Sequence, residues 1–158
     1  MMLAYRLVHL IETHSDALAA SLIRKVQQSE CTPAYHNVPA QELKEQVAEI
    51  YHHLGEWLLG KTDLDIRGRY REIGECRAHQ HVPFSQVAWA ICLTRANLWE
   101  FLKRDADIER PSEIFGELEL LQMLDQFFER AIYYAALGYE GAPALPDAQQ
   151  PKTMLRRA

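Results

Sequence analysis

Apolar residues recur at every third or fourth position through most of the chain, which is the spacing that one face of an α-helix requires. The clearest stripe has spacings of four and three and consists of Leu43, Val47, Ile50, Leu54 and Trp57. Strand-like alternation of apolar and polar residues is nearly missing. The prolines fall between the periodic stretches, at positions 33, 39, 83, 111, 143, 146 and 151. This pattern predicts an all-α fold.

The periodic stretches predict a bundle of about five to six helices. They cover residues 3–29, a stretch from the end of a loop at 33–39 to Gly60, and residues 66–80, 84–104 and 112–139. Gly60 suits a helix end because glycine tolerates the left-handed conformation found there. Residues 66–80 are poor in apolar side chains and rich in charge, so we expect a short helix lying across the surface. A polar connection is expected at 105–111.

The helices predicted after position 83 are the most apolar. Residues 88–93 are apolar on nearly every side, which is typical of a central, buried helix. The last helix carries two adjacent apolar stripes, Leu120, Leu124, Phe127, Ala131 and Tyr134 beside Leu118, Leu121, Phe128, Ile132 and Ala135. So wide an arc fits a helix buried from two sides or one that packs on a second subunit. We predict a homodimer with Leu121, Phe128, Ile132 and Ala135 in its interface.

Composition is that of an ordinary globular protein of one domain. The 158 residues are 48% apolar and 25% charged, and the net charge is -5 at pH 7. This acidic balance, without a basic stripe, argues against nucleic-acid binding. We expect residues 1–140 to form the domain. Residues 141–158 contain three prolines and few large apolar side chains, which predicts a flexible tail or linker stub.

Three features favour a cytoplasmic location. The longest apolar run, residues 87–93, is too short to span a bilayer, so we expect no membrane partner. The N-terminus lacks the basic and apolar regions of a signal peptide. The three cysteines show no metal-type pairing, which suggests reduced thiols.

Sequence motifs for catalysis or metal binding are weak. There is no Gly-x-Ser-x-Gly elbow, no phosphate-binding glycine loop and no Rossmann fingerprint, so we expect no enzymatic activity. Glu72, Cys76 and His79 have helical spacing and could share one face as a metal site. Neither zinc-finger cysteine pairs nor a His-Glu-x-x-His motif accompany them, so we expect no metal.

Two polar residues interrupt apolar stripes. His14 stands in the stripe of the first helix, where we favour a core-edge histidine that bonds a carbonyl or water over a group facing a ligand cavity. Arg95 interrupts the helix predicted to be buried, and a buried guanidinium needs a partner. Either its stem reaches to solvent or a carboxylate from the last helix pairs with it.

The segment around Pro83 carries a pattern similar to that of a known family. A charge-rich helix ends before this proline and an apolar helix starts directly after it. The matching residues are Gly74, Arg77-Ala78, Gln80, Val82-Pro83-Phe84-Ser85, Leu93, Arg95, Leu98-Trp99 and Phe101-Leu102, and then residues 128–134 and 138–140. Over residues 3–140 the chain resembles the N-terminal sensor domain of RsbR-type co-antagonist proteins and of some sensor histidine kinases.

The resemblance implies a globin-like helical domain, usually without haem, that is homodimeric and serves as a signal-input module. Such domains precede a STAS output domain in stressosome proteins, or a kinase core. Only about eighteen residues follow the exit helix here, so we expect the STAS or histidine kinase module on a partner protein. The expected function is a non-catalytic sensor in a bacterial stress or two-component pathway, acting through dimerisation and helix repacking.

The candidate residues for an internal pocket are His14, Arg77, His79, His81, Trp89 and Arg95. In the similar globin-coupled sensors, a histidine a few residues before such a corner ligates haem, and Arg77 takes that position here. A guanidinium has no lone pair for iron, so we expect no haem. The alternative is a haem-binding gas sensor in which a shifted register brings His79 or His81 to the iron.

Overall fold

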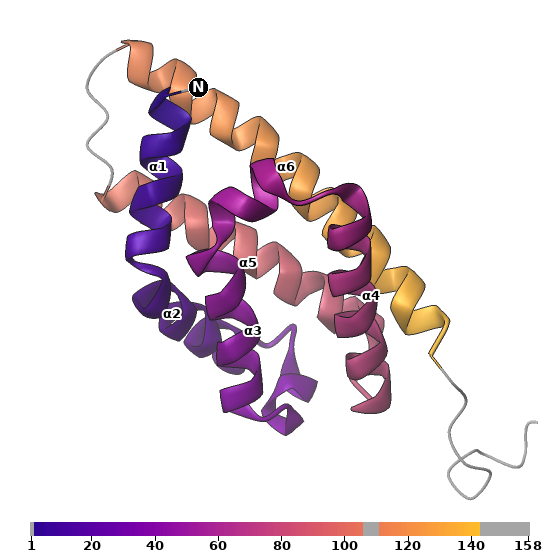
Figure 1. Ribbon diagram of the computed structural model, residues 1–158. Helices are drawn as coiled ribbons and strands as arrows, with labels where there is room; N and C mark the ends of the chain where they lie inside the picture. Colours follow the sequence, from indigo (N-terminus) through magenta and orange to yellow (C-terminus); the bar gives the residue numbers. More distant parts are fainter. Residues whose placement is uncertain (1, 106–110, 143–158) are drawn as a thin grey trace, which may run out of the picture.

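A computed structural model describes residues 2–105 and 111–142, and their regular structure is helical throughout (Figure 1). The α-helices are α1 (Met2–Thr13), α2 (Ser15–Gln28), α3 (Ala40–His52), α4 (Asp63–His79), α5 (Phe84–Asp105) and α6 (Pro111–Glu140). Two short turns, η1 (Pro33–Asn37) and η2 (Glu56–Gly60), complete the chain order. The all-α prediction is confirmed. Most of the connection predicted at 105–111 and of the tail predicted at 141–158 lies outside the described residues.

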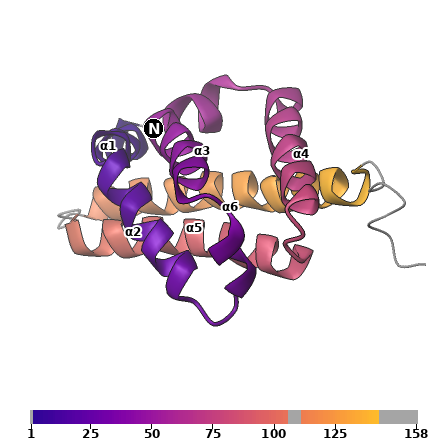
Figure 2. The ribbon, with the colours of Figure 1, turned by 90° about the horizontal axis from the view of Figure 1, so that it is seen from below.

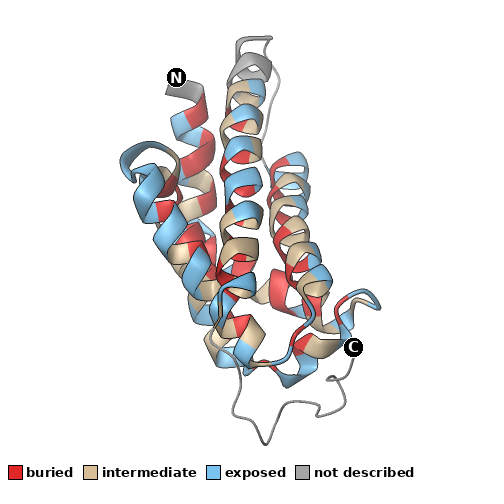
Figure 3. Ribbon diagram, turned by 90° about the vertical axis from the view of Figure 1, so that its right-hand side faces the viewer, coloured by how far each residue is buried: buried red, intermediate tan, exposed pale blue. Residues whose placement is uncertain are grey.

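The helices form a bundle along α6, which has 30 residues and runs the length of the molecule (Figure 1). The Phe84 and Tyr139 ring centres lie 5.5 Å apart, and Arg95 Nη1 lies 3.2 Å from Asp125 Oδ1. α5 and α6 are therefore antiparallel neighbours, as Figure 2 shows. Buried residues lie mostly where helices face one another (Figure 3). None of the helices in the described part of the chain has the length and apolar content needed to cross a membrane.

The proline corner between α4 and α5 is a hydrogen-bonded helix end. His81 N–H donates to the Ala78 carbonyl and Val82 N–H donates to the Arg77 carbonyl, each over 3.1 Å. His81 has a φ of 60°, the left-handed conformation that glycine usually supplies at this position. The carbonyl of Pro83 then accepts the first hydrogen bonds of α5. The sharp corner predicted at Pro83 is confirmed.

The single helix predicted over residues 3–29 is wrong. The chain forms α1 and α2, which are separated at His14 with φ -106° and ψ 21°. This bend lets α1 pack on α6 while α2 packs on α3 and α5. Ile11 and Ser15 lie on either side of the bend and are both buried. The apolar stripe runs through both helices, so periodicity could not reveal the change of direction.

Two other boundaries differ from the prediction. The segment predicted as a loop at 33–39 contains the 3-10 turn η1, which has a proline in its first turn. The next helix, α3, ends at His52, and the chain reaches Gly60 through the π-helical turn η2. The stripe from Leu43 to Trp57 is nevertheless buried along its whole length. The buried face was predicted correctly, whereas the change in backbone pitch was not.

The prediction that residues 66–80 form a short surface helix is wrong. α4 has 17 residues and makes the most extensive helix–helix contact of the described chain, with α6. A Cβ at Gly74 would overlap the Ala135 carbonyl oxygen, and one at Gly138 would overlap the Arg71 carbonyl oxygen. The two backbones therefore touch, which requires glycine at both points. Glycine adds nothing to an apolar stripe, so the sequence pattern concealed this contact.

α5 is less enclosed than its composition predicts. Val87 and Leu98 are buried, but Trp89 is 45% exposed, and Cys92 and Leu93 are half-buried. One side of the helix packs on α2 and α6, and the other side faces outward. The last predicted helix is confirmed to within one residue at each end.

Candidate functional site

A buried guanidinium organises the C-terminal end of α4. The Arg77 side chain is 3% exposed, and its Nη1 donates to Gln80 Oε1 (2.9 Å) and lies 3.5 Å from Glu42 Oε1. Its Nη2 donates to Gln46 Oε1. The guanidinium also lies over the ring of Tyr35, 5.6 Å from its centre. The Arg77 cluster is defined here as Tyr35, Glu42, Gln46, Cys76, Arg77 and Gln80.

The Arg77 cluster keeps one charge pair and leaves its other groups neutral. Burial alone would raise the pKa of Glu42. Hydrogen bonds from the Cys76 thiol (3.2 Å) and the Gln80 amide (3.0 Å), together with the Arg77 charge, outweigh it and lower that pKa. Burial, with the bond to Glu42, raises the pKa of Cys76, and burial raises the pKa of Tyr35. A protonated thiol is a poor nucleophile, so the cluster is not suited to covalent catalysis.

A partly open pocket of about 60 Å³, called here the interior cavity because mostly buried residues line it, lies beside the Arg77 cluster. The residues with polar side chains among those that line it are Tyr35, Gln46, Tyr70, Arg77 and Thr94. Apolar side chains from α2, α3, α5 and α6 form most of the rest, among them Leu22, Val47, Ile50, Val87, Ile91 and Phe128. The cavity thus lies where these helices and α4 meet, and any change in its filling would act on all of them.

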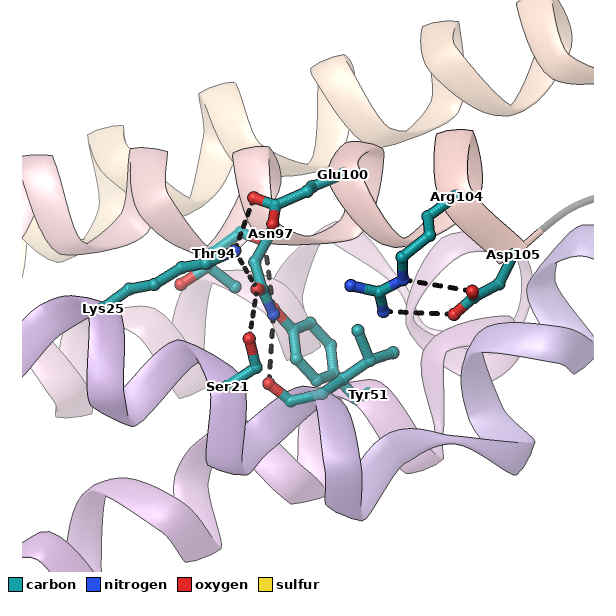
Figure 4. Close-up of polar contacts among 9 residues, drawn as sticks. Ser21, Lys25, Tyr51, Thr94, Asn97, Glu100, Arg104 and Asp105 are labelled. Atoms are coloured by element: carbon teal, nitrogen blue, oxygen red, sulfur yellow. Dashed lines mark hydrogen bonds and ion pairs between the residues drawn. The ribbon is translucent and has the colours of Figure 1, made fainter.

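A second polar network crosses the core at Asn97, which is 2% exposed. Asn97 Oδ1 accepts hydrogen bonds from Lys25 Nζ (2.6 Å) and Ser21 Oγ (3.2 Å), as Figure 4 shows. Its Nδ2 donates to the Leu18 carbonyl (3.0 Å) and the Tyr51 hydroxyl (3.4 Å). Two acceptor and two donor positions are filled, which is the full capacity of an amide. Asn97 therefore joins α5 to α2 and α3 and has no capacity left for a ligand.

The cavity beside Asn97, of about 100 Å³, is lined by His14. Its charged side chains are paired with each other, Lys25 with Glu100 at 2.7 Å and Arg104 with Asp105 at 3.1 Å. His14 itself is exposed, and its Nδ1 lies 2.9 Å from a backbone carbonyl one turn earlier. Of the two partners expected for His14, a carbonyl or a water, the structure shows a carbonyl, and the residue is exposed although it stands in the apolar stripe of the sequence.

The residues predicted to share one pocket do not come together. Arg77 lines the interior cavity, and His14 lines the other one. Trp89 is 45% exposed on α5. Arg95 has a side chain 41% exposed and pairs with Asp125 of α6. Of the two alternatives left open for Arg95, the structure shows the carboxylate from the last helix, but the buried setting predicted for Arg95 was wrong.

His79 and His81 are exposed, and neither lines the interior cavity. An iron bound by either imidazole would lie outside the fold, and a cavity of about 60 Å³ is small beside the 300 Å³ or more of typical cofactor sites. The residues present therefore do not fit a buried haem. Of the predicted metal ligands, Glu72 is exposed and Cys76 donates to Glu42. Among the side chains that the structure describes, no group of three or more that could bind a metal occurs.

The residues predicted for the dimer interface fall into two pairs. Phe128 and Ala135 are 2% and 0% exposed within a single protomer, so their assignment to a subunit contact was wrong. Phe128 lines the interior cavity, and the backbone of Ala135 touches Gly74. Leu121 and Ile132 are half-buried and stay candidates. The wide apolar arc exists because α1, α4 and α5 all pack on α6.

Sequence reasoning missed several residues of this site. Glu42 and Gln46 are four residues apart, so both lie on the same edge of α3, beside its apolar stripe. This spacing was a signal that the two side chains could bind one partner. Tyr35 gave no signal because it lies in the segment predicted as a loop. Tyr70 was assigned to a surface helix because the close contact of α4 with α6 was not recognised.

The comparison with known families identifies the chain. A family model described as "RsbT co-antagonist protein rsbRD N-terminal domain" matches residues 16–146, which include nearly all of α2, α3 to α6 and the Arg77 cluster. The chain belongs to this family. The RsbRD N-terminal domain is a signalling domain of the RsbR type, as the resemblance had implied. No curated protein and no solved structure matches the chain.

Proposed function

We propose that this RsbRD N-terminal domain is a non-catalytic signal-input module of a bacterial stress or two-component pathway. One observation carries the proposal: α4, which bears the Arg77 cluster and part of the interior cavity, lies backbone to backbone against α6. α6 ends at Glu140 and is the last helix before the end of the family match at residue 146. It is thus the element that leads out of the domain.

A backbone contact is well suited to transmit a change in helix packing. Where Gly74 and Gly138 meet the opposite helix, no flexible side chain lies between the two backbones to absorb a displacement of α4. A shift at the cavity or at the Arg77 cluster therefore moves α6. Such coupling needs only a few kcal/mol of difference between two packings. The output is a STAS or histidine kinase module on a partner protein in the cytoplasm.

The proposal includes a homodimer formed through α5 and α6. Trp89 on α5 is 45% exposed, and Leu118 on α6 is 53% exposed. Leu121 and Ile132 are half-buried on α6. Large exposed side chains of this kind, tryptophan above all, are frequent anchors of protein interfaces. A second copy packed here would receive a displacement of α6 directly.

Changing the anchors tests the dimer. We expect the wild type to be a dimer in native mass spectrometry and sedimentation velocity, and Trp89→Glu or Leu118→Glu to weaken association at least about tenfold. The physical reason is that a carboxylate loses hydration when the interface forms. Leu64→Glu is the matched control, because Leu64 is 74% exposed on α4 and is not one of the proposed anchors. A wild type that stays monomeric at about 100 μM contradicts the dimer.

A further inference from the structure

Trp57 carries a buried polar atom that has no hydrogen-bond partner. The residue is 5% exposed, and no group within the described residues accepts a hydrogen bond from its indole Nε1. Among the described side chains, the other atoms of this kind are Glu49 Oε2 and Arg69 Nε. Those two side chains at least face each other, with Arg69 Nη2 3.7 Å from Glu49 Oε2. A buried donor without an acceptor is unfavourable, so Trp57 points to a ligand that supplies one.

Trp57 lines a partly open pocket of about 70 Å³, called here the η2–α6 pocket because most of its lining residues belong to these two elements. The lining residues that have polar side-chain groups are Trp57, Lys61, Gln126 and Arg130. The others are apolar, among them Leu58 and Met123. Of the described residues that line this pocket, none carries a carboxylate. η2 is a π-helical turn, a backbone feature that is frequent at functional sites.

Two cations lie in the wall of the η2–α6 pocket. Lys61 Nζ lies over the Trp57 indole, 5.4 Å from its ring centre, and has no ion pair within the described part of the chain. Arg130 Nε lies 3.8 Å from Asp63 Oδ1, a long contact between half-exposed side chains. Asp65, which also feels the charge of Lys61, is engaged in the N-terminal cap of α4. Neither aspartate is among the lining residues, so the wall itself is positively charged.

We propose that the η2–α6 pocket binds a short-chain monocarboxylate, of the class of acetate and propionate. The carboxylate pairs with Lys61 and Arg130 and accepts the hydrogen bond of Trp57 Nε1. The hydrocarbon end lies against the apolar part of the wall. An apolar cavity of about 150 Å³ accommodates benzene, so the 70 Å³ of this pocket admits roughly three to five non-hydrogen atoms. Phosphate fits less well, because the apolar side chains cannot replace the hydration of its second charge.

The indole resonance of Trp57 gives the most direct test of the site. In 1H–15N NMR titrations of the full chain with sodium propionate at constant ionic strength, we expect this signal to move downfield saturably, with a dissociation constant on the order of millimolar. The indole signals of Trp89 and Trp99 should stay in place, because neither residue lines the pocket. Trp57→Phe assigns the signal. Propionamide, the neutral analogue, should bind at least about tenfold more weakly.

Variants without the two positive charges separate this pocket from a general attraction of anions. Lys61→Gln and Arg130→Gln should each weaken propionate binding roughly threefold or more, and the double variant roughly tenfold or more. Both residues are exposed, so the variants should keep the fold. Lys44→Gln is the matched control, because it removes an exposed lysine of α3 that does not line the pocket. It should leave the affinity for propionate unchanged.

Three results would overturn the site. They are a Trp57 indole signal that does not shift saturably, an equal affinity for propionamide, and an affinity for propionate that the double variant leaves unchanged. Inorganic phosphate that binds as tightly as propionate would overturn the assignment to a monocarboxylate. The binding site stands by itself, whereas its role as an input signal acting on α6 rests on the proposed function. Propionate binding without any effect on the dimer would therefore preserve the site and remove the signalling role.

Discussion

Replacing Gly74 with alanine is expected to lower the free energy of unfolding by about 3 kcal/mol. The added methyl group would overlap the Ala135 carbonyl oxygen, which belongs to the backbone of a long helix and cannot move away alone. α4 and α6 would have to separate along the most extensive helix contact in the described chain. Urea denaturation followed by circular dichroism measures the change directly.

Gly68 provides the matched control in the same helix. Its side-chain position is open, with no atom within 4 Å of an added Cβ, so Gly68→Ala should stabilise the domain by up to about 1 kcal/mol. Gly138→Ala should resemble Gly74→Ala. The double variant Gly74→Ala/Gly138→Ala should lower the free energy of unfolding by clearly less than the sum of the two single losses, because helices already separated by one methyl group can accept the other. A loss below about 0.5 kcal/mol for Gly74→Ala contradicts the backbone contact.

Replacing Glu42 with alanine is expected to lower the free energy of unfolding by about 3 kcal/mol. Replacing its partner Arg77 with methionine should lower it less, by about 1–2 kcal/mol. The asymmetry follows from exposure: the Arg77 side chain is 3% exposed and that of Glu42 is 30% exposed. A carboxylate left alone can be hydrated, whereas a guanidinium left alone stays buried with only amide oxygens for partners. Denaturation of both single variants at neutral pH gives the comparison.

The double variant Glu42→Ala/Arg77→Met controls for lost packing. It should be more stable than Glu42→Ala alone, because removing the buried charge relieves the penalty that Glu42→Ala creates. Purely additive losses, or a greater loss for Arg77→Met than for Glu42→Ala, would show that the cluster is held by packing and not by the charge pair.

The buried face of a helix could be predicted where its packing contacts are made by apolar side chains. The stripe from Leu43 to Trp57 and the extent of α6 follow from periodicity, because burying those side chains is what fixes the helices in place. The bend at His14 was not predictable, because apolar residues on both sides of it keep the same period. The turn η2 was hidden for the same reason.

Contacts made by glycine or by polar groups left little trace in the sequence. α4 resembled a surface helix because its main contact is made by Gly74, which has no side chain. Its buried charge, Arg77, pairs with Glu42 of α3, which is distant in the sequence. The resemblance placed Arg77 where a haem sensor has its ligand. Within this fold the residue instead binds a carboxylate and two amides. The cavity and Tyr70 could be found only once several helices were placed together.

The most direct test of signal input is the dimer dissociation constant with the interior cavity empty and filled. Sedimentation equilibrium of the wild type would be compared with that of Ala90→Leu, in which a larger side chain fills the cavity from α5, with Gly68→Ala as the control. Because filling the cavity and displacing α6 are coupled in this account, we predict that Ala90→Leu changes the dissociation constant roughly fivefold or more. In Gly68→Ala the dissociation constant should stay that of the wild type. An unchanged dissociation constant in a folded Ala90→Leu would contradict transmission through α6.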